Sequence, residues 1–137
     1  MYFDTSVLLP VYFPEPRSEE AERLLRESGS PMVSDLAFAE FLVALGRKQK
    51  LNEITPLQSA TVRAAFEGHF ARGHFQALHL QPRHFRLAGE LAGRSSVILR
   101  TLDALHLALA ADTGFPLATF DRRLAEAGRG LGFEVAG

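Results

Sequence analysis

Four acidic residues lie in otherwise apolar stretches of the chain, where a folding protein rarely places a charge: Asp4, Glu40, Asp103 and Asp121. Glu40, for example, is the only charged residue in the run from Leu36 to Leu45. A buried carboxylate without a partner is costly and tends to lose its charge. Several such groups close together repel one another unless a cation lies among them. The pattern therefore indicates a site for a hard divalent metal ion, and with it a catalytic site.

The chemistry expected of such a site is hydrolysis of a phosphodiester. Ligands that are all oxygen suit Mg²⁺ or Mn²⁺ better than zinc or copper. Such an ion lowers the pKa of a bound water, binds phosphate oxygens and stabilises the leaving oxygen of an in-line displacement. We therefore predict Mg²⁺ or Mn²⁺ as the cofactor.

Each acid also has a simpler interpretation when it is considered alone. An aspartate that follows a strand commonly caps the next helix, which applies to Asp4 and Asp121. Asp103 could cap its own helix or pair with a residue three positions away. Glu40 has only apolar neighbours one helical turn away, so a partner for it would have to come from a distant part of the chain. A shared metal site explains all four residues together.

Short apolar segments alternate with longer helical patterns along the chain. We expect strands over residues 2–4, 31–34, 77–80, 116–120 and 133–135. We expect helices over residues 5–11, 17–27, 35–48, 56–74, 82–93, 102–112 and 121–128, with caps at Ser34 or Asp35, Thr55 and Thr101. This alternation predicts an α/β fold whose central parallel sheet is covered by helices on both faces. No repeat or linker interrupts the pattern, so we expect one domain over residues 1–137.

The predicted elements bring the four acids to one place. In parallel sheets, ligands bind beyond the carboxyl ends of the strands. Asp4 and Asp121 each follow directly on a predicted strand. Glu40 lies in the second turn of the helix after the second strand, and Asp103 lies in the first turn of its helix. We therefore expect all four side chains at the same edge of the sheet.

The composition is that of an ordinary globular protein, with no cysteine for a disulfide or a thiolate zinc site. The chain has no apolar run of about 18 residues and no signal-peptide pattern at its start, so we expect a cytoplasmic protein without membrane contact. The net charge is −1, so binding to nucleic acid would depend on local basic groups. Those groups are Arg47/Lys48/Lys50, Arg83/Arg86, Arg94/Arg100 and Arg122/Arg123.

The histidines suggest an alternative metal site, of the zinc type. Four of the five recur at intervals of five residues: His69, His74, His79 and His84. That interval does not place them on one helix face, and none has the i,i+4 spacing of helical zinc ligands. We expect these four at or near the surface. His106, one turn after Asp103, is interpreted as a partner of the acids or a core histidine rather than a general base.

Together, the segments around the four acids resemble those of the PIN-domain ribonucleases, and most closely those of VapC-type toxins of toxin–antitoxin pairs. The segments are Tyr2-Phe-Asp4-Thr-Ser-Val-Leu-Leu, Ser34-Asp-Leu-Ala-Phe-Ala-Glu40-Phe, Thr101-Leu-Asp103-Ala-Leu-His-Leu-Ala and Ala118-Thr-Phe-Asp121-Arg-Arg-Leu. The resemblance covers essentially the whole chain. It implies a three-layer α/β/α domain, Mg²⁺- or Mn²⁺-dependent RNA cleavage, inhibition by a cognate antitoxin, and a homodimer.

The resemblance also implies roles for individual residues. Asp4, Glu40 and Asp103 would be the core metal ligands, and Asp121 would complete the quartet or hold a second ion. Three hydroxyl residues match positions near the metal and would orient its ligands or the attacking water: Thr5, Ser6 and Thr119. An antitoxin would lie in an apolar groove, which we expect beside Phe38, Phe41 and Leu45 and along the facing side of the helix over residues 55–74.

Three other functions fit parts of the sequence. A PIN nuclease for RNA processing would have the same site without an antitoxin. A non-catalytic PIN scaffold usually lacks some of the acids, all of which are present here. A phosphatase of the haloacid-dehalogenase type needs a second aspartate two residues after the first, where this chain has Ser6. A small antitoxin-like gene directly upstream would favour the toxin over the processing nuclease.

Overall fold

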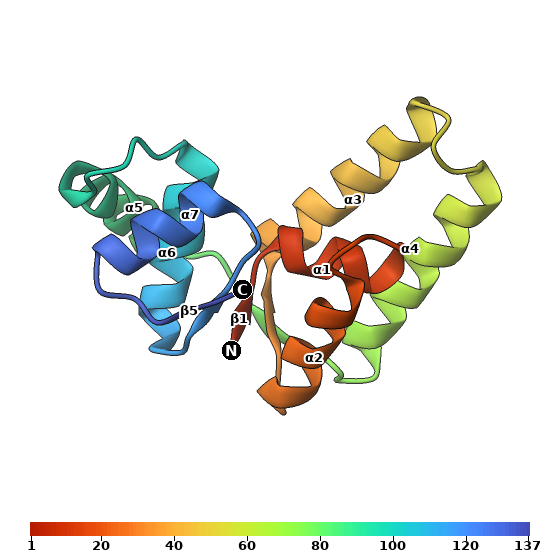
Figure 1. Cartoon of the computed structure of the whole chain (residues 1–137), viewed down its shortest axis with the longest axis horizontal. Coiled ribbons are helices and arrows are strands. Elements are labelled where there is room, and N and C mark those ends of the chain that lie inside the picture. The colour runs from red at the N-terminus through yellow and green to blue at the C-terminus, as the bar shows by residue number, and fades with distance from the viewer.

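The computed structural model describes residues 1–137 and contains five short strands and seven helices. The strands are β1 (Tyr2–Phe3), β2 (Met32–Ser34), β3 (Gln76–Leu78), β4 (Leu117–Ala118) and β5 (Val135–Ala136). The helices are α1 (Thr5–Tyr12), α2 (Ser18–Ser28), α3 (Asp35–Lys50), α4 (Pro56–Ala71), α5 (Pro82–Arg94), α6 (Thr101–Thr113) and α7 (Arg122–Gly130). The predicted elements are therefore all present in the predicted order (Figure 1).

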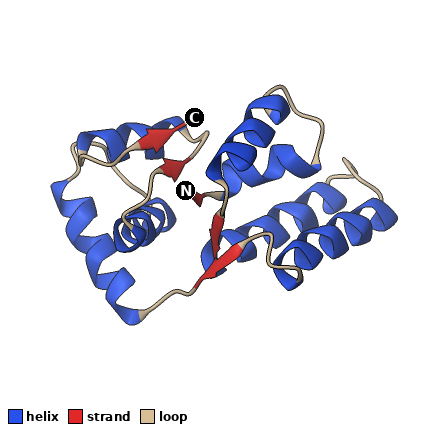
Figure 2. Ribbon diagram, turned by 90° about the horizontal axis from the view of Figure 1, so that it is seen from below, coloured by secondary structure: helices blue, strands red, loops and turns tan.

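All five strands form one parallel sheet in the order β3-β2-β1-β4-β5. β1 is the central strand, and its Tyr2 is in register with Met32 on one side and with Leu117 on the other. The predicted α/β fold with a central parallel sheet is confirmed (Figure 2). Because the strands are parallel, the segments that follow β1, β2 and β4 leave the sheet at one edge.

The sheet separates two apolar cores, because neighbouring residues of a strand point to opposite faces. Tyr2 and Leu117 pack into the core formed mainly with α5, α6 and α7. Phe3 and Ala118 pack into the core formed with α1, α2, α3 and α4. Figure 1 shows these two groups of helices on either side of the strands, which gives the three layers α/β/α.

Local capping explains where several helices begin. The Ser34 hydroxyl accepts a hydrogen bond from the Ala37 amide and so caps α3, as predicted. Thr55 caps α4 in a reciprocal arrangement with Gln58. The prediction for α6 is wrong by one position. Thr101 is its first helical residue and Arg100 occupies the capping position, because the Arg100 backbone is still extended.

The expectation for His84 is wrong, because this side chain is buried. Its Nδ1 accepts a hydrogen bond from the Gln81 amide at the start of α5, and the ring is enclosed. The groove expected beside Phe38, Phe41 and Leu45 stays a prediction: Phe41 and Leu45 belong to the interior, and Phe38 is half-buried. Phe41 stacks on Phe66 of α4 with ring centroids 3.9 Å apart, so this surface is used to hold α3 against α4.

None of the helices combines the length and the apolar character that crossing a bilayer requires.

Candidate active site at the carboxyl edge of the sheet

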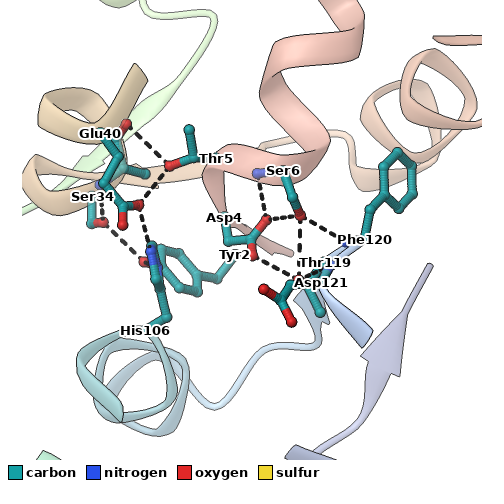
Figure 3. Close-up of polar contacts among 11 residues, drawn as sticks. Tyr2, Asp4, Thr5, Ser6, Ser34, Glu40, His106, Thr119, Phe120 and Asp121 are labelled. Carbon is teal, nitrogen blue, oxygen red and sulfur yellow. Dashed lines mark hydrogen bonds and ion pairs between the residues drawn. The ribbon is translucent and has the colours of Figure 1, made fainter. Parts of the chain in front are cut away.

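Asp4 lies at the end of the central strand and is almost completely buried, with 4% of its surface exposed. Its Oδ1 accepts hydrogen bonds from the Ser6 amide at 2.9 Å and from the Ser6 hydroxyl at 2.5 Å. Its Oδ2 accepts one from the Thr119 hydroxyl at 2.6 Å (Figure 3). The carboxylate thus caps α1. It is held by Ser6 from the segment after β1 and by Thr119 from the segment after β4.

The surroundings of Asp4 disfavour its charge. Burial raises the pKa of Asp4, and the nearby His106 together with the hydrogen bonds from Ser6 and Thr119 offsets only part of that effect. The net shift of the pKa is upward. An ionised Asp4 is therefore costly in this position, and a cation beside it would reduce the cost.

Glu40 lies on the second turn of α3 and is half-buried. Its Oε2 accepts hydrogen bonds from the Thr5 hydroxyl and from His106 Nε2, both at 2.7 Å. Burial by itself would raise the pKa of Glu40, but the hydrogen bond and charge of His106, with the bond from Thr5, lower it overall. Glu40 is thus held in its ionised form.

His106 belongs to a buried chain of hydrogen bonds that begins at the start of α3. Its Nδ1 lies 2.6 Å from the Tyr2 hydroxyl, which lies 2.9 Å from the Ser34 hydroxyl. With a neutral imidazole, Ser34 donates to Tyr2, Tyr2 donates to Nδ1, and Nε2–H donates to Glu40. A protonated imidazole reverses the first two bonds and carries the positive charge that acts on Asp4 and Glu40. Burial raises the pKa of Tyr2 well above its usual value, so Tyr2 keeps the proton that both arrangements need.

The sequence predicted part of this chain. His106 was interpreted as a partner of the acids or a core histidine, and it is both buried and bonded to Glu40. The apolar pattern of the first strand does not predict the hydrogen bonds that the Tyr2 hydroxyl makes. The sequence feature that indicates this role is the tyrosine hydroxyl itself, because a tyrosine buried in a central strand needs a hydrogen-bond partner.

Asp103 and Asp121 each accept hydrogen bonds from main-chain amides near the start of a helix. Asp103 is half-buried in the first turn of α6, where its Oδ2 accepts from the Arg100 amide at 3.4 Å. Asp121 caps α7 by accepting from the Arg123 and Leu124 amides at 2.8 and 3.0 Å. The Asp121 amide donates to the Thr119 hydroxyl, which in turn donates to Asp4.

Not all of the four acids are buried as the sequence suggested. Asp121 is exposed, because β4 ends at Ala118 and the chain has already reached the surface. Thr119 connects Asp121 to Asp4, whereas no hydrogen bond connects Glu40 or Asp103 to Asp4. His106 provides the electrostatic connection, since it acts on the pKa of both Asp4 and Glu40.

The four acids have the oxygen donor atoms and the negative charge that a hard cation requires. None of them forms an ion pair with a lysine or an arginine, and the only ion-pair partner of Glu40 is the imidazole of His106. All the donor atoms are oxygens, the type that Mg²⁺ and Mn²⁺ prefer. No three histidine, aspartate or glutamate side chains are arranged to hold one ion together in this structure. Each of the four acids accepts hydrogen bonds of its own.

Comparison with known proteins agrees with this architecture. Residues 1–130 match the family model of the PIN domain. Ribonuclease VapC46 of Mycobacterium tuberculosis is 34% identical over 138 aligned residues, which cover 98% of this chain and 95% of that protein.

Solved structures share the fold at lower identity. The crystal structure of VapC20 from Mycobacterium tuberculosis, described as a sarcin–ricin loop cleaving toxin, matches with a TM-score of 0.72 and 19% identity over 93% of this chain and 94% of that one. The FitAcB structure from Neisseria gonorrhoeae matches with a TM-score of 0.77 and 15% identity over 99% of this chain and 96% of that one.

Proposed function

This chain belongs to the PIN-domain family, and we propose that it is a metal-dependent ribonuclease acting as the toxin of a toxin–antitoxin pair. The observation that carries the proposal is the environment of Asp4. It is a buried carboxylate at the end of the central strand, oriented by two hydroxyls and paired with no lysine or arginine. The 34% identity to a ribonuclease along nearly the whole chain supports RNA as the substrate.

The proposed roles follow from the contacts. Asp4, Glu40 and Asp103 hold Mg²⁺ or Mn²⁺, and Asp121 adds a fourth ligand or serves a second ion. When bound, such an ion supplies positive charge against the phosphodiester and lowers the pKa of water, so that water can displace the ribose oxygen from phosphorus. Ser6 and Thr119 fix the orientation of Asp4, while Thr5 fixes that of Glu40.

Removal and return of the metal tests the nuclease directly. Cleavage of a labelled RNA by the purified protein should stop in EDTA and resume with Mg²⁺ or Mn²⁺. The melting temperature should rise with metal concentration, because an ion bound only by the native state stabilises that state. Glu40→Gln should be inactive in parallel preparations, which excludes a contaminating nuclease. Cleavage at full rate in EDTA would contradict a metal-dependent mechanism.

The proposed partner is an antitoxin encoded by the neighbouring gene, and the active form is proposed to be a homodimer. A solved VapBC2 complex from Rickettsia felis, bound to a promoter DNA fragment, contains a chain of the same fold with a TM-score of 0.70 and 16% identity. Co-purification of the upstream product, with cleavage suppressed at equimolar ratio, is the expected result. A nuclease that no neighbouring product binds or inhibits would favour the RNA-processing alternative.

Two substitutions at Asp121 separate its capping role from its proposed metal role. Asp121→Ser should keep the free energy of unfolding close to that of the wild type, because a serine hydroxyl also accepts from the first amides of a helix. Asp121→Ala should lose about 1 kcal/mol with the cap. Both variants lack the carboxylate, so we expect both to cleave RNA about tenfold more slowly, in line with a loss of about 1.4 kcal/mol. Wild-type cleavage by Asp121→Ser, with the cap intact, would restrict Asp121 to a structural role.

A further inference from the structure

A cavity of about 280 Å³ opens beside the acidic edge, on the side of Asp4 away from Glu40 and His106. Thr119, Phe120 and Asp121 form its near wall (Figure 3). Since the Thr119 hydroxyl bonds to Asp4, the cavity and the candidate active site share this segment. The remaining lining residues are Arg17, Arg122, Ala125, Glu126, Arg129 and Gly137.

Three of the lining side chains are arginines, and they are held to different degrees. Arg17 pairs through Nε with Glu20 at 2.7 Å, and its guanidinium carbon lies 3.6 Å from the centre of the Phe120 ring. Arg129 donates to the main-chain oxygen of Gly137 at 3.3 Å. Arg122 forms no ion pair and no side-chain hydrogen bond within the protein.

The acids of the cavity leave Arg122 without an ion pair. Asp121 and Glu126 line the cavity together with three arginines, of which Arg17 is paired with Glu20. Oδ1 of Asp121 is occupied by the first amides of α7. The cavity therefore offers guanidinium donors to an anion directly beside a cluster of carboxylates that would repel one.

Two of the other basic side chains are already engaged by acids. Lys48 is engaged by both Glu15 and Glu53, and Arg83 is engaged by Asp112. An RNA strand that approaches the four acids needs positive charge close to them, since the net charge of the protein is −1. Two of the basic groups identified in the sequence lie beside one of the four acids: Arg122 lines the cavity with Asp121, and Arg100 precedes Asp103 at the start of α6.

We propose that this cavity binds the phosphate next to the scissile phosphodiester, through Arg122 and Arg129. The Arg17 guanidinium, already placed over Phe120, provides a charged surface on which the adjoining base can stack. This inference rests on the proposed ribonuclease function and adds to it the position of the flanking nucleotide. The strand runs across Asp4, with its neighbouring phosphate beyond Thr119 and Asp121.

Binding without cleavage tests the charge contribution. The probe is a fluorescein-labelled, single-stranded oligoribonucleotide of about 12 nucleotides, a length within the range over which binding grooves track single strands. It is titrated against the full chain in EDTA. We expect Arg122→Ala and Arg129→Ala each to weaken binding about tenfold at low salt. Each should also lower the slope of log Kd against log salt by about 0.7, the value for one phosphate contact on a single strand.

Two control variants distinguish a local contact from a general loss of charge. Arg63→Ala removes the same charge from α4, where Arg63 pairs with Glu67, and should bind nearly as well as the wild type. Arg122→Lys keeps the charge and should recover part of the affinity. Equal melting temperatures for all variants show that the fold is intact. Unchanged affinity in the Arg122→Ala/Arg129→Ala double variant overturns the inference.

A modified substrate locates the contact on the RNA. Once the cleavage position is mapped, the phosphate on either side of it is replaced by an uncharged methylphosphonate with a 2′-O-methyl group on the adjoining sugar. The matched substrate carries the 2′-O-methyl group and an ordinary phosphate. At one of the two positions the neutral linkage should raise the KM of the wild type about tenfold and leave that of the double variant unchanged.

The outcomes separate this inference from the proposed function. If the wild type cleaves RNA and the neutral linkage slows wild type and double variant equally, the phosphate is not bound here and the inference fails alone. If the wild type neither binds nor cleaves RNA with metal present, the ribonuclease proposal fails and this inference fails with it.

Discussion

Replacement of Asp4 by asparagine is expected to reduce RNA cleavage by at least about 1,000-fold, a loss of about 4 kcal/mol of transition-state stabilisation. Asparagine keeps an oxygen that can accept from Ser6, so the start of α1 should be preserved. The side chain loses the charge by which it would hold the metal ion. Initial rates with saturating Mn²⁺, measured beside circular dichroism of the same samples, check this result.

The same substitution should change how stability depends on pH. Burial raises the pKa of Asp4 in the folded protein, so its protonated form favours folding. This contribution is fully present below the ordinary aspartate pKa, about 3.9, and is lost as the pH rises through the raised value. Without metal, Asp4→Asn should therefore melt at a higher temperature than the wild type at neutral pH.

The control for Asp4 is Asp112→Asn, which removes the same charge from the end of α6, where Asp112 pairs with Arg83. It should cleave RNA at the wild-type rate. Strong cleavage by Asp4→Asn would exclude Asp4 from the metal site. A lower melting temperature for metal-free Asp4→Asn at neutral pH would show that its ionised form is stabilised in the native state, contrary to the environment described here.

Replacement of His106 by leucine is expected to damage both stability and activity. The leucine would leave the Tyr2 hydroxyl and Glu40 Oε2 without their buried partner. Ser34 and Thr5 still pair with these groups, so the loss is that of two hydrogen bonds, one of them to a charged group, and the free energy of unfolding should fall by about 2–4 kcal/mol. Glu40 would also lose one of the two bonds that orient it, and cleavage should fall about 100-fold, or about 2.7 kcal/mol. Urea unfolding and initial rates measure the two effects.

Three further variants show whether His106 acts through Glu40. His106→Gln can still donate a hydrogen bond near the position of Nε2 and should recover part of the activity. Tyr2→Phe removes one hydroxyl and should cost about 1 kcal/mol. The double variant Tyr2→Phe/His106→Leu should be less destabilised than the sum of the single variants, because the two side chains share one bond. Additive losses, with no recovery in His106→Gln, would reduce His106 to a packing residue.

The sequence by itself determined the fold class and the order of the strands and helices along the chain. These depend on local signals: apolar runs short enough for strands, helical periodicity, and caps such as Ser34 and Thr55. Such signals place strands and helices in order along the chain, and a parallel sheet then fixes which strand ends share an edge. The boundaries of the elements were correct to within a few residues for the same reason.

Only the tertiary structure decided how the acids are held. The pairing of Thr5 with Glu40 instead of the adjacent Asp4, and that of Tyr2 with His106 across 104 positions, depends on how α3 and α6 pack against the sheet. The exposure of Asp121 depends on where β4 ends. Periodicity records whether a side chain faces inward, but the partner that it meets there is set by contacts between segments far apart in the sequence.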